Sequence, residues 1–291
     1  MRANGKIQLY VAKDLNDALT KVSDPGCNWQ PLAGGTDIMV HAGSSLQMGA
    51  KFIAIGHLPE LRSIELQNET LSIGSCATYT DIRSDNLVKK YFPMLDQAAA
   101  ATGALAIQNQ GTIGGNIANA SPAADTPPAL LAYGAEIQLI STRGTRTMPY
   151  CDFHTGYKTT AKKPDEIIRR VILRKTNESN FLTFYRKVGT RSTQAISKVV
   201  FAASAGMTAN GFISHIRLAY GSMGPTPLRA LRTESLLKGT EASNIPADEA
   251  IRTLAKDLCP IDDIRSTKTY RQAVAGNLLK QFIEQLRGIT V

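Results

Sequence analysis

Two glycine pairs are the residues of this chain best suited to holding a ligand. One lies in PLAGGTDI at residues 31–38 and the other in TIGGNIANASPAAD at residues 112–125. Glycine has no Cβ, so a ligand can approach the backbone closely, and backbone N–H groups in such loops bind phosphate oxygens. An isolated glycine pair is more often a tight turn. Both pairs, however, follow apolar residues and precede a small polar residue. This shared pattern favours a phosphate-rich cofactor that is held at two points.

The remaining reactive residue types form no self-contained catalytic or metal site. The four cysteines and four histidines are widely separated in the sequence. Neither the C-x-x-C spacing of zinc and iron–sulfur sites nor a G-x-S-x-G nucleophile turn occurs. The G-x-G-x-x-G dinucleotide fingerprint and the P-loop are absent as well. We therefore predict reduced thiols, structural histidines, no metal ligands and no catalytic side chain.

The net charge of +9 raises the question of a nucleic-acid partner. Lysine and arginine are spread along the chain, with only isolated pairs such as Lys89-Lys90 and Arg169-Arg170. A nucleic-acid surface usually shows a clustered stripe with interleaved aromatic residues. An anionic cofactor or an acidic partner subunit accounts for the charge more simply.

Length and hydropathy favour a globular protein with two or three subdomains. The chain has 291 residues, and its first residues, MRANGKIQLYVAKDL, lack the apolar core of a signal peptide. No apolar run approaches the roughly 20 residues that cross a bilayer. We expect a cytoplasmic protein without a membrane span.

Short elements are predicted around each glycine pair. Residues 29–32 form a strand that enters the first pair, and residues 38–42 continue it as a strand or the start of a helix. Before the second pair we expect a strand from Cys76 to Thr80 and two helices. Further predicted strands are 7–11, 51–55, 70–73, 136–141 and 145–148, and the predicted helices are 14–23, 81–89, 92–106 and 127–133.

The last third of the chain has a different pattern. Residues 167–174, 181–188, 198–207 and 212–221 are predicted strands, and 229–237 and 270–289 are predicted helices. Consecutive strands followed by helices indicate a separate α+β domain, with a boundary near residues 175–180.

The two glycine motifs together resemble the flavin-binding loops of the molybdenum hydroxylase family, in its FAD-binding medium subunits. Three further segments match in the expected order: FHTGYKTTAKKPDEII at 153–168, FYRKVGTRSTQAISKV at 184–199 and MGPTPLRA at 223–230. The resemblance implies an α+β protein with the FAD-binding fold of the vanillyl-alcohol oxidase type, followed by a C-terminal α+β domain of antiparallel strands and helices. The implied units are two FAD-binding subdomains at 1–55 and 56–176 and the C-terminal domain at 177–291.

The resemblance also implies a set of cofactor-binding residues. The two loops would hold the pyrophosphate, Asp125 would lie beside the cofactor, and Ile168 and Lys187 would border it. A lysine near the flavin ring would stabilise negative charge on reduced flavin. A branched side chain at Gly114 or Gly115 would occupy the space of the pyrophosphate. The full set is Pro31, Leu32, Ala33, Gly34, Gly35, Thr36, Asp37, Ile38, Thr112, Ile113, Gly114, Gly115, Asn116, Ser121, Asp125, Ile168 and Lys187.

The implied function is that of an FAD subunit most similar to the xanthine dehydrogenase type. Molybdopterin would be bound by a large partner subunit and [2Fe–2S] clusters by a small one, and FAD would pass electrons to an acceptor such as NAD+. Alternatives are a flavin subunit of a carbon monoxide or aldehyde dehydrogenase, a free-standing FAD reductase, and a nucleotide-binding scaffold without redox function. Thr102 stands where animal relatives carry an aromatic residue on the flavin ring. Gln194 and Ala195 stand where some relatives carry two acidic residues.

Overall fold

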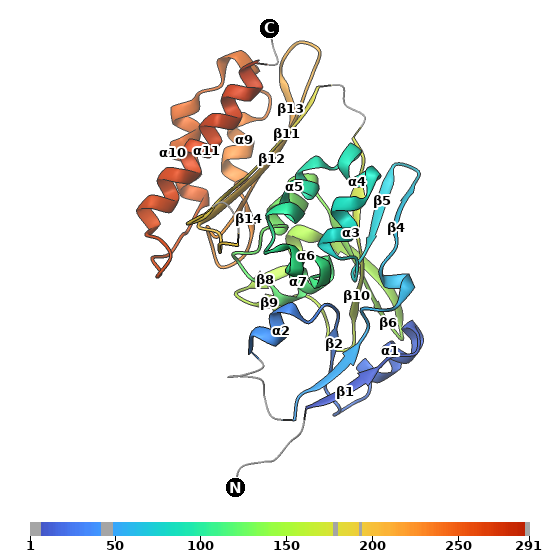
Figure 1. The fold of residues 1–291 in the computed structure, drawn as a ribbon. Coiled ribbons are helices and arrows are strands. Elements are labelled where there is room, and N and C mark those ends of the chain that lie inside the picture. Colours follow the sequence, from blue (N-terminus) through green and yellow to red (C-terminus); the bar gives the residue numbers. More distant parts are fainter. Residues whose placement is uncertain (1–6, 42–48, 177–179, 192–193, 289–291) are drawn as a thin grey trace.

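The computed structural model describes residues 7–41, 49–176, 180–191 and 194–288. Three sheets follow one another along the chain, and Figure 1 shows them from the N-terminal sheet at one end to the C-terminal helices at the other. A fourth, two-stranded sheet pairs β8 (His154–Gly156) with β9 (Thr159–Thr160). None of the helices in these ranges combines the length and apolar character needed to cross a bilayer.

The first unit is a parallel sheet with one helix packed against it. Its strands β1 (Gln8–Val11), β3 (Lys51–Ala54) and β2 (Trp29–Leu32) are adjacent in that order. The carboxylate of Asp14 caps α1 (Leu15–Val22), and the apolar face of this helix is buried in the same cluster as Ile53. The ambiguous segment at 38–42 is resolved as helix α2 (Thr36–His41).

The middle unit is an antiparallel sheet that packs against a layer of helices. The strand order is β4 (Ile64–Gln67), β5 (Thr70–Gly74), β10 (Ile167–Arg174), β6 (Glu136–Ser141) and β7 (Gly144–Pro149). The predicted strand 167–174 is therefore the central strand of this sheet and not the first of the C-terminal domain. The helices are α3 (Tyr79–Ser84), α4 (Asn86–Tyr91), α5 (Pro93–Ala101), α6 (Leu105–Gln110), α7 (Ile113–Asn119) and α8 (Pro127–Tyr133), with short 3-10 turns at Pro59–Leu61 and Tyr150–Asp152.

Several helix predictions were wrong in this unit, because local caps divide the segments. The strand predicted from Cys76 to Thr80 is absent, because Thr78 forms a capping box with Asp81 and starts α3. Asp85 accepts bonds from two backbone N–H groups and starts α4, which divides the predicted helix 81–89. Gly103, at φ +60, separates α5 from α6 within the predicted helix 92–106.

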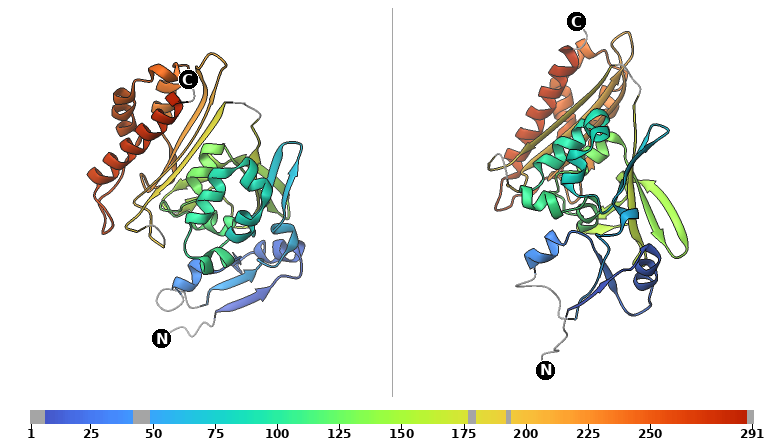
Figure 2. Two further views of the ribbon diagram at one scale, coloured as in Figure 1. Left: turned by 45° about the horizontal axis from the view of Figure 1, so that its top comes forward. Right: turned by 45° about the vertical axis from the view of Figure 1, so that its right-hand side comes forward.

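The C-terminal unit is an antiparallel sheet covered on both faces. Strands β11 (Phe181–Val188), β12 (Val199–Met207), β13 (Ile213–Gly221) and β14 (Leu228–Arg229) pair in sequence order. One face packs against α9 (Leu231–Leu237) and α11 (Lys268–Gly288), and the other against α5 and α8 of the middle unit (Figures 1 and 2). Helix α10 (Ala247–Asp257), which was not predicted, packs on α9 and α11; a 3-10 turn precedes it at Ala242–Asn244.

Alternation along the strands produces the two cores. Phe201 and Leu218 face the C-terminal helices, whereas Ala202 and Ala219 belong to the core of the middle unit. Successive side chains of a strand point to opposite faces. The C-terminal sheet thus contributes to the core of the middle unit as well as to its own. This packing holds the two units together around a shared cleft.

Candidate functional site

The two glycine motifs meet in space. Gly34 lies so close to the end of α6 that a Cβ atom built on it would be 1.7 Å from the carbonyl oxygen of Gln110. The amide of Asn119 donates to the Asp37 carboxylate at 3.1 Å, which ties α7 to the first motif. The two motifs, residues 31–38 and 112–125, therefore pack against each other, and we call this packed pair the clasp.

A cavity of about 550 Å³ lies between the motifs. All eight predicted residues of the first motif line it, namely Pro31, Leu32, Ala33, Gly34, Gly35, Thr36, Asp37 and Ile38. From the second motif it is lined by Thr112, Gly115 and Asn116. The backbone N–H groups of Gly34, Gly35 and Thr36 have no acceptor among the described residues. This edge of the cavity can donate hydrogen bonds to an anion.

The start of the second motif, Thr112–Asn116, is the N-cap and first turn of helix α7 and not an open loop. Its backbone donors already have partners: Ile113 donates to Ala77 at 3.1 Å, Gly114 to Ser75 at 2.8 Å, and Gly115 to the Thr112 hydroxyl at 3.1 Å. A Cβ on Gly114 would lie 2.5 Å from the Ser75 Cβ, so this glycine is required for packing and not for pyrophosphate space. Gly115 is exposed and borders the cavity.

A second cavity of about 930 Å³ continues the first. Both are lined by Ile107, Asn116 and Asn119, so they form one extended cleft. Ser121 and Asp125, two of the residues that the resemblance assigns to the cofactor, line the second cavity. Tyr157 and Lys158 from the β8–β9 turn and Gln194, Ala195, Arg265 and Arg271 from the C-terminal unit complete its wall.

Asp125 joins the cleft to the C-terminal sheet. Its carboxylate accepts a hydrogen bond from the Ser197 hydroxyl at 2.5 Å and pairs with the Lys187 ammonium at 2.7 Å. Lys187 also donates to the carbonyl of Ala101 at 2.8 Å. Burial raises the pKa of Asp125, and the Lys187 charge and the Ser197 hydrogen bond partly oppose that effect. Lys187 is thus a buried partner of Asp125 and not a solvated charge.

Ile168 lies behind the clasp. It lines a small cavity of about 100 Å³ together with Gly114, Gly115 and Lys162. Ile113 is fully buried in the middle core. The cleft thus gathers most of the predicted residues, whereas Ile113, Gly114, Ile168 and Lys187 lie around it.

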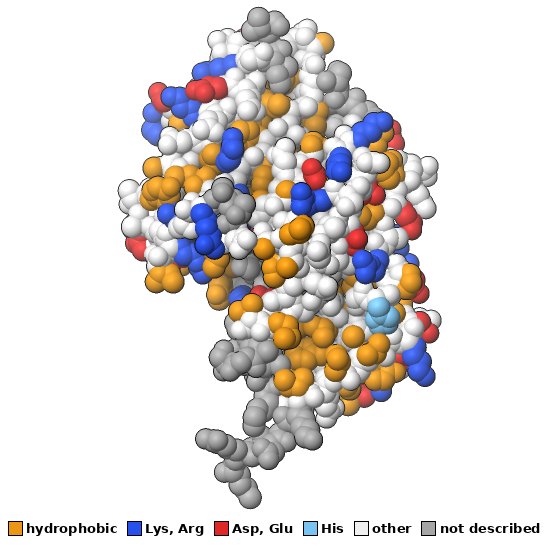
Figure 3. Space-filling model, viewed as in Figure 1, with side chains coloured by type: hydrophobic (Ala, Val, Ile, Leu, Met, Phe, Trp, Pro, Cys, Tyr) orange, Lys and Arg blue, Asp and Glu red, His pale blue; other side chains and the backbone are white. Residues whose placement is uncertain are grey.

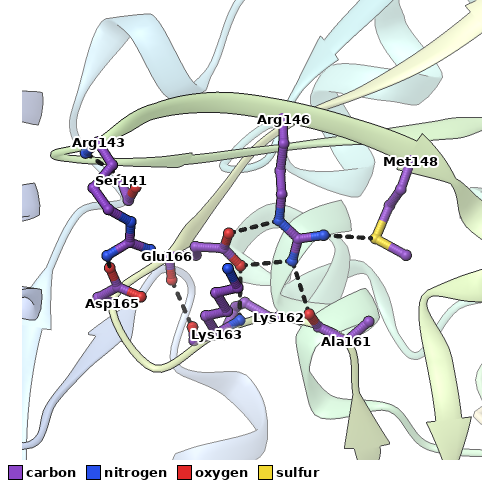
Figure 4. Close-up of polar contacts among 9 residues, drawn as sticks. All are labelled: Ser141, Arg143, Arg146, Met148, Ala161, Lys162, Lys163, Asp165 and Glu166. Atoms are coloured by element: carbon purple, nitrogen blue, oxygen red, sulfur yellow. Dashed lines mark hydrogen bonds and ion pairs between the residues drawn. The ribbon is translucent and has the colours of Figure 1, made fainter.

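An ion pair holds the segment that precedes Ile168. The Arg146 guanidinium contacts the Glu166 carboxylate through two bonds, Nε to Oε1 at 2.6 Å and Nη2 to Oε2 at 2.8 Å (Figure 4). The Lys163 N–H also donates to Oε2, at 2.7 Å, and the Lys162 ammonium donates to the Glu166 carbonyl at 3.1 Å. The Arg146 hydrogen bond is the main cause that lowers the pKa of Glu166.

Three polar features of the cleft were not predicted. Tyr79 lines the first cavity, and its buried hydroxyl lies near the Thr126 and Thr102 hydroxyls without a hydrogen bond of normal length and angle in the described ranges. The Thr126 hydroxyl donates to the Asn116 amide oxygen at 2.9 Å. Asn119 had a sequence signal, because it lies within the second motif. Tyr79 and Thr126 had none, since only long-range packing brings them to the cleft.

The described part of the chain shows no arrangement of side chains typical of a metal site and no distribution of charge typical of a nucleic-acid surface. No group of three or more metal-binding side chains occurs there. Lysine and arginine are scattered over the face in Figure 3 and form no continuous stripe. Histidines 57 and 154 bond backbone carbonyls at 2.8 and 2.9 Å, as expected of structural residues. The side chain of His41 lies outside the described residues.

Two protein-family models match the chain. Residues 5–175 match the FAD binding domain in molybdopterin dehydrogenase, and residues 184–286 match the CO dehydrogenase flavoprotein C-terminal domain. The chain is 30% identical to the xanthine dehydrogenase FAD-binding subunit of Escherichia coli O157:H7, over 94% of both chains. It is 28% identical to the carbon monoxide dehydrogenase medium chain of Hydrogenophaga pseudoflava, over 95% of both.

Solved structures agree with these matches. The structure of carbon monoxide dehydrogenase from Hydrogenophaga pseudoflava superimposes with a TM-score of 0.87 at 26% identity, covering 96% of both chains. Quinoline 2-oxidoreductase from Pseudomonas putida shares the fold with a TM-score of 0.87 at 22% identity, covering 98% of both chains. The predicted α+β architecture with an FAD-binding fold is confirmed.

Proposed function

Because the chain belongs to the FAD-binding subunits of the molybdenum hydroxylase family, we propose that it serves a xanthine dehydrogenase-type complex and passes electrons through FAD to NAD+. Its oxidoreductase role and its FAD cofactor follow from the family. We propose the identities of the electron donor, the electron acceptor and the individual FAD-binding residues. We also propose the units 1–55, 56–176 and 177–291, since each of the three larger sheets lies within one of them.

The observation that supports this function best is the extended cleft that both glycine motifs line. Ligand pockets of roughly 300–1,000 Å³ accommodate cofactor-sized molecules. One end of the cleft offers the unpartnered N–H groups of the first motif, and the other is walled by Asp125 and the C-terminal unit. An elongated molecule fits this arrangement if its phosphate groups accept from these N–H groups and the rest of it reaches the C-terminal unit.

The protein residues would bind and orient the cofactor without making or breaking bonds. When bound, FAD supplies the exchange between two-electron and one-electron chemistry. Gly34, Gly35 and Thr36 would donate to the pyrophosphate, and Gly115 would let it approach α7. The Asp125–Lys187 pair would set the charge near the flavin end, with Lys187 acting through Asp125.

The partners are part of the proposal. Relatives are named as medium chains and FAD subunits of dehydrogenases. We propose that this chain assembles with a large molybdopterin-binding subunit and a small [2Fe–2S] subunit in the cytoplasm. The net charge of +9 would favour acidic partner surfaces.

Co-purification from the native host tests the assembly. A complex that contains molybdenum and iron and reduces NAD+ with a purine substrate is expected. The chain alone should show the two visible absorption bands of oxidised flavin. If the isolated chain lacks these bands and takes up no added FAD, the proposed function is wrong.

A carbon monoxide or aldehyde dehydrogenase is the second candidate. The carbon monoxide dehydrogenase relative above covers as much of the chain as the xanthine dehydrogenase relative, and a glyceraldehyde dehydrogenase medium chain of Sulfolobus acidocaldarius is also 30% identical. A substrate panel on the purified complex, with purines, carbon monoxide and aldehydes, separates these candidates. Full activity of the lone chain would instead indicate a free-standing reductase.

A further inference from the structure

Thr126 and Asn116 form a hydrogen bond where the two cavities join. Thr126 immediately precedes α8 and is 0% exposed, whereas Asn116 lies on α7 and lines both cavities. The Thr126 hydroxyl donates to Oδ1 of Asn116 at 2.9 Å. A carboxamide has one acceptor end and one donor end, and in this structure the acceptor end, Oδ1, faces Thr126.

This bond uses Oδ1 of Asn116, so the NH2 group of the side chain remains available to a ligand in the cleft. No acceptor in the described part of the chain bonds to its Nδ2. Because Oδ1 is held on the protein side, the NH2 group is the branch that a ligand can reach. The helix fixes the backbone of Asn116, whose N–H bonds to the Thr112 carbonyl at 3.0 Å, so the bond to Thr126 is what restrains the remaining side-chain torsions.

A second polar group of interest beside the first cavity is the hydroxyl of Tyr79. The Tyr79 hydroxyl is buried and makes no hydrogen bond of normal length and angle in the described ranges, although the Thr126 and Thr102 hydroxyls lie close enough to oppose part of the rise in its pKa. Tyr79 borders the first cavity, which Asn116 also lines. Burial raises the pKa of Tyr79, so the group stays protonated and can donate. An unpartnered buried hydroxyl costs free energy that a polar ligand can relieve.

We propose that Thr126 is a positioning residue for FAD. By holding Oδ1 of Asn116, it presents the Asn116 NH2 group to an oxygen of the cofactor where FAD passes from the first cavity into the second. The inference rests on the proposed function, since it requires FAD in this cleft.

FAD titration of flavin-free protein, followed by quenching of flavin fluorescence, tests the proposal. Thr126→Val should raise the Kd for FAD roughly tenfold, the usual order for one lost hydrogen bond, and Thr126→Ser should restore affinity. With Asn116→Ala already present, Thr126→Val should have no further effect on Kd. Thr233→Val is the matched control, because Thr233 is also 0% exposed and donates to Asp257, at 2.8 Å, away from the cleft. The control should lower Tm and leave Kd unchanged.

Two results would overturn the proposal: an unchanged Kd in Thr126→Val, or an equal rise in Kd with and without Asn116. If Thr126→Val does not fold, Asn116→Asp decides, because aspartate keeps the acceptor for Thr126 and loses the donor. A normal Kd in Asn116→Asp would then reject the role. Failure of the wild-type chain to bind FAD would instead reject the proposed function itself.

Discussion

Gly34 and Gln110 pack backbone to backbone, with only 1.7 Å between the Gln110 carbonyl oxygen and the position that a Cβ on residue 34 would take. This contact joins the first glycine motif to the residues just before the second. The reason for glycine at position 34 is thus the neighbouring chain segment.

Gly34→Ala should open the clasp. The added methyl group meets backbone atoms that cannot rotate away, so we expect a loss of about 3 kcal/mol in the free energy of unfolding and loss of FAD binding. Denaturant unfolding and flavin content measure the two effects. Gly288→Ala is the control, because nothing lies within 4 Å of its Cβ position and both properties should stay unchanged.

The adjacent glycines of α7 should respond differently to alanine. Gly114→Ala forces a Cβ against Ser75 and should lower stability by about 2 kcal/mol even without flavin. Gly115→Ala meets only the Thr112 hydroxyl and should change stability by less than about 1 kcal/mol, since alanine favours helix. Its effect should be a raised Kd for FAD. Equal thermal melts of the two flavin-free variants would contradict this division.

Lys187→Met should destabilise the protein by leaving Asp125 buried without its cation. Breaking such a pair costs about 3 kcal/mol, because one charge stays buried and unpaired. Adding Asp125→Asn to Lys187→Met should recover part of the loss, because the unpaired charge is then absent. Urea unfolding of both variants at pH 7 checks this order. A double variant no more stable than Lys187→Met would show that the pair is not energetically coupled.

His215 should make stability depend on mildly acidic pH. Burial, followed by the nearby charges of Arg217 and Arg229, lowers the pKa of His215 from 6.5 to about 4. Because the folded pKa is the lower one, the unfolded chain takes up the proton first as pH falls. The contribution of the neutral ring is therefore complete above pH 6.5 and is lost progressively as pH falls through about 4. His215→Gln should flatten the unfolding free energy across this window; an unchanged slope would exclude His215 as the cause.

Local signals predicted much of the fold. The strand at Trp29–Leu32 and the helix at Pro127–Tyr133 were predicted with the observed limits, because strand-forming residues and helix-starting prolines act within a few residues. The helix predicted at 81–89 was wrong, since a side-chain cap at Asp85 competes with helix propensity. Strand 167–174 was grouped with the strands that follow it, although the predicted boundary lies after it, because its partners β5 and β6 are distant in sequence.

The sequence by itself determined the family and the small residues and short donors from which a cofactor site can be built. Only the tertiary structure decided how they are used. Gly114 and Gly115 are adjacent and chemically identical, but a helix turns by roughly 100° per residue, so one is packed on Ser75 and the other faces the cleft. The Thr126–Asn116 bond likewise depends on how the chain returns to α7 after residues 120–125, which neither residue encodes alone.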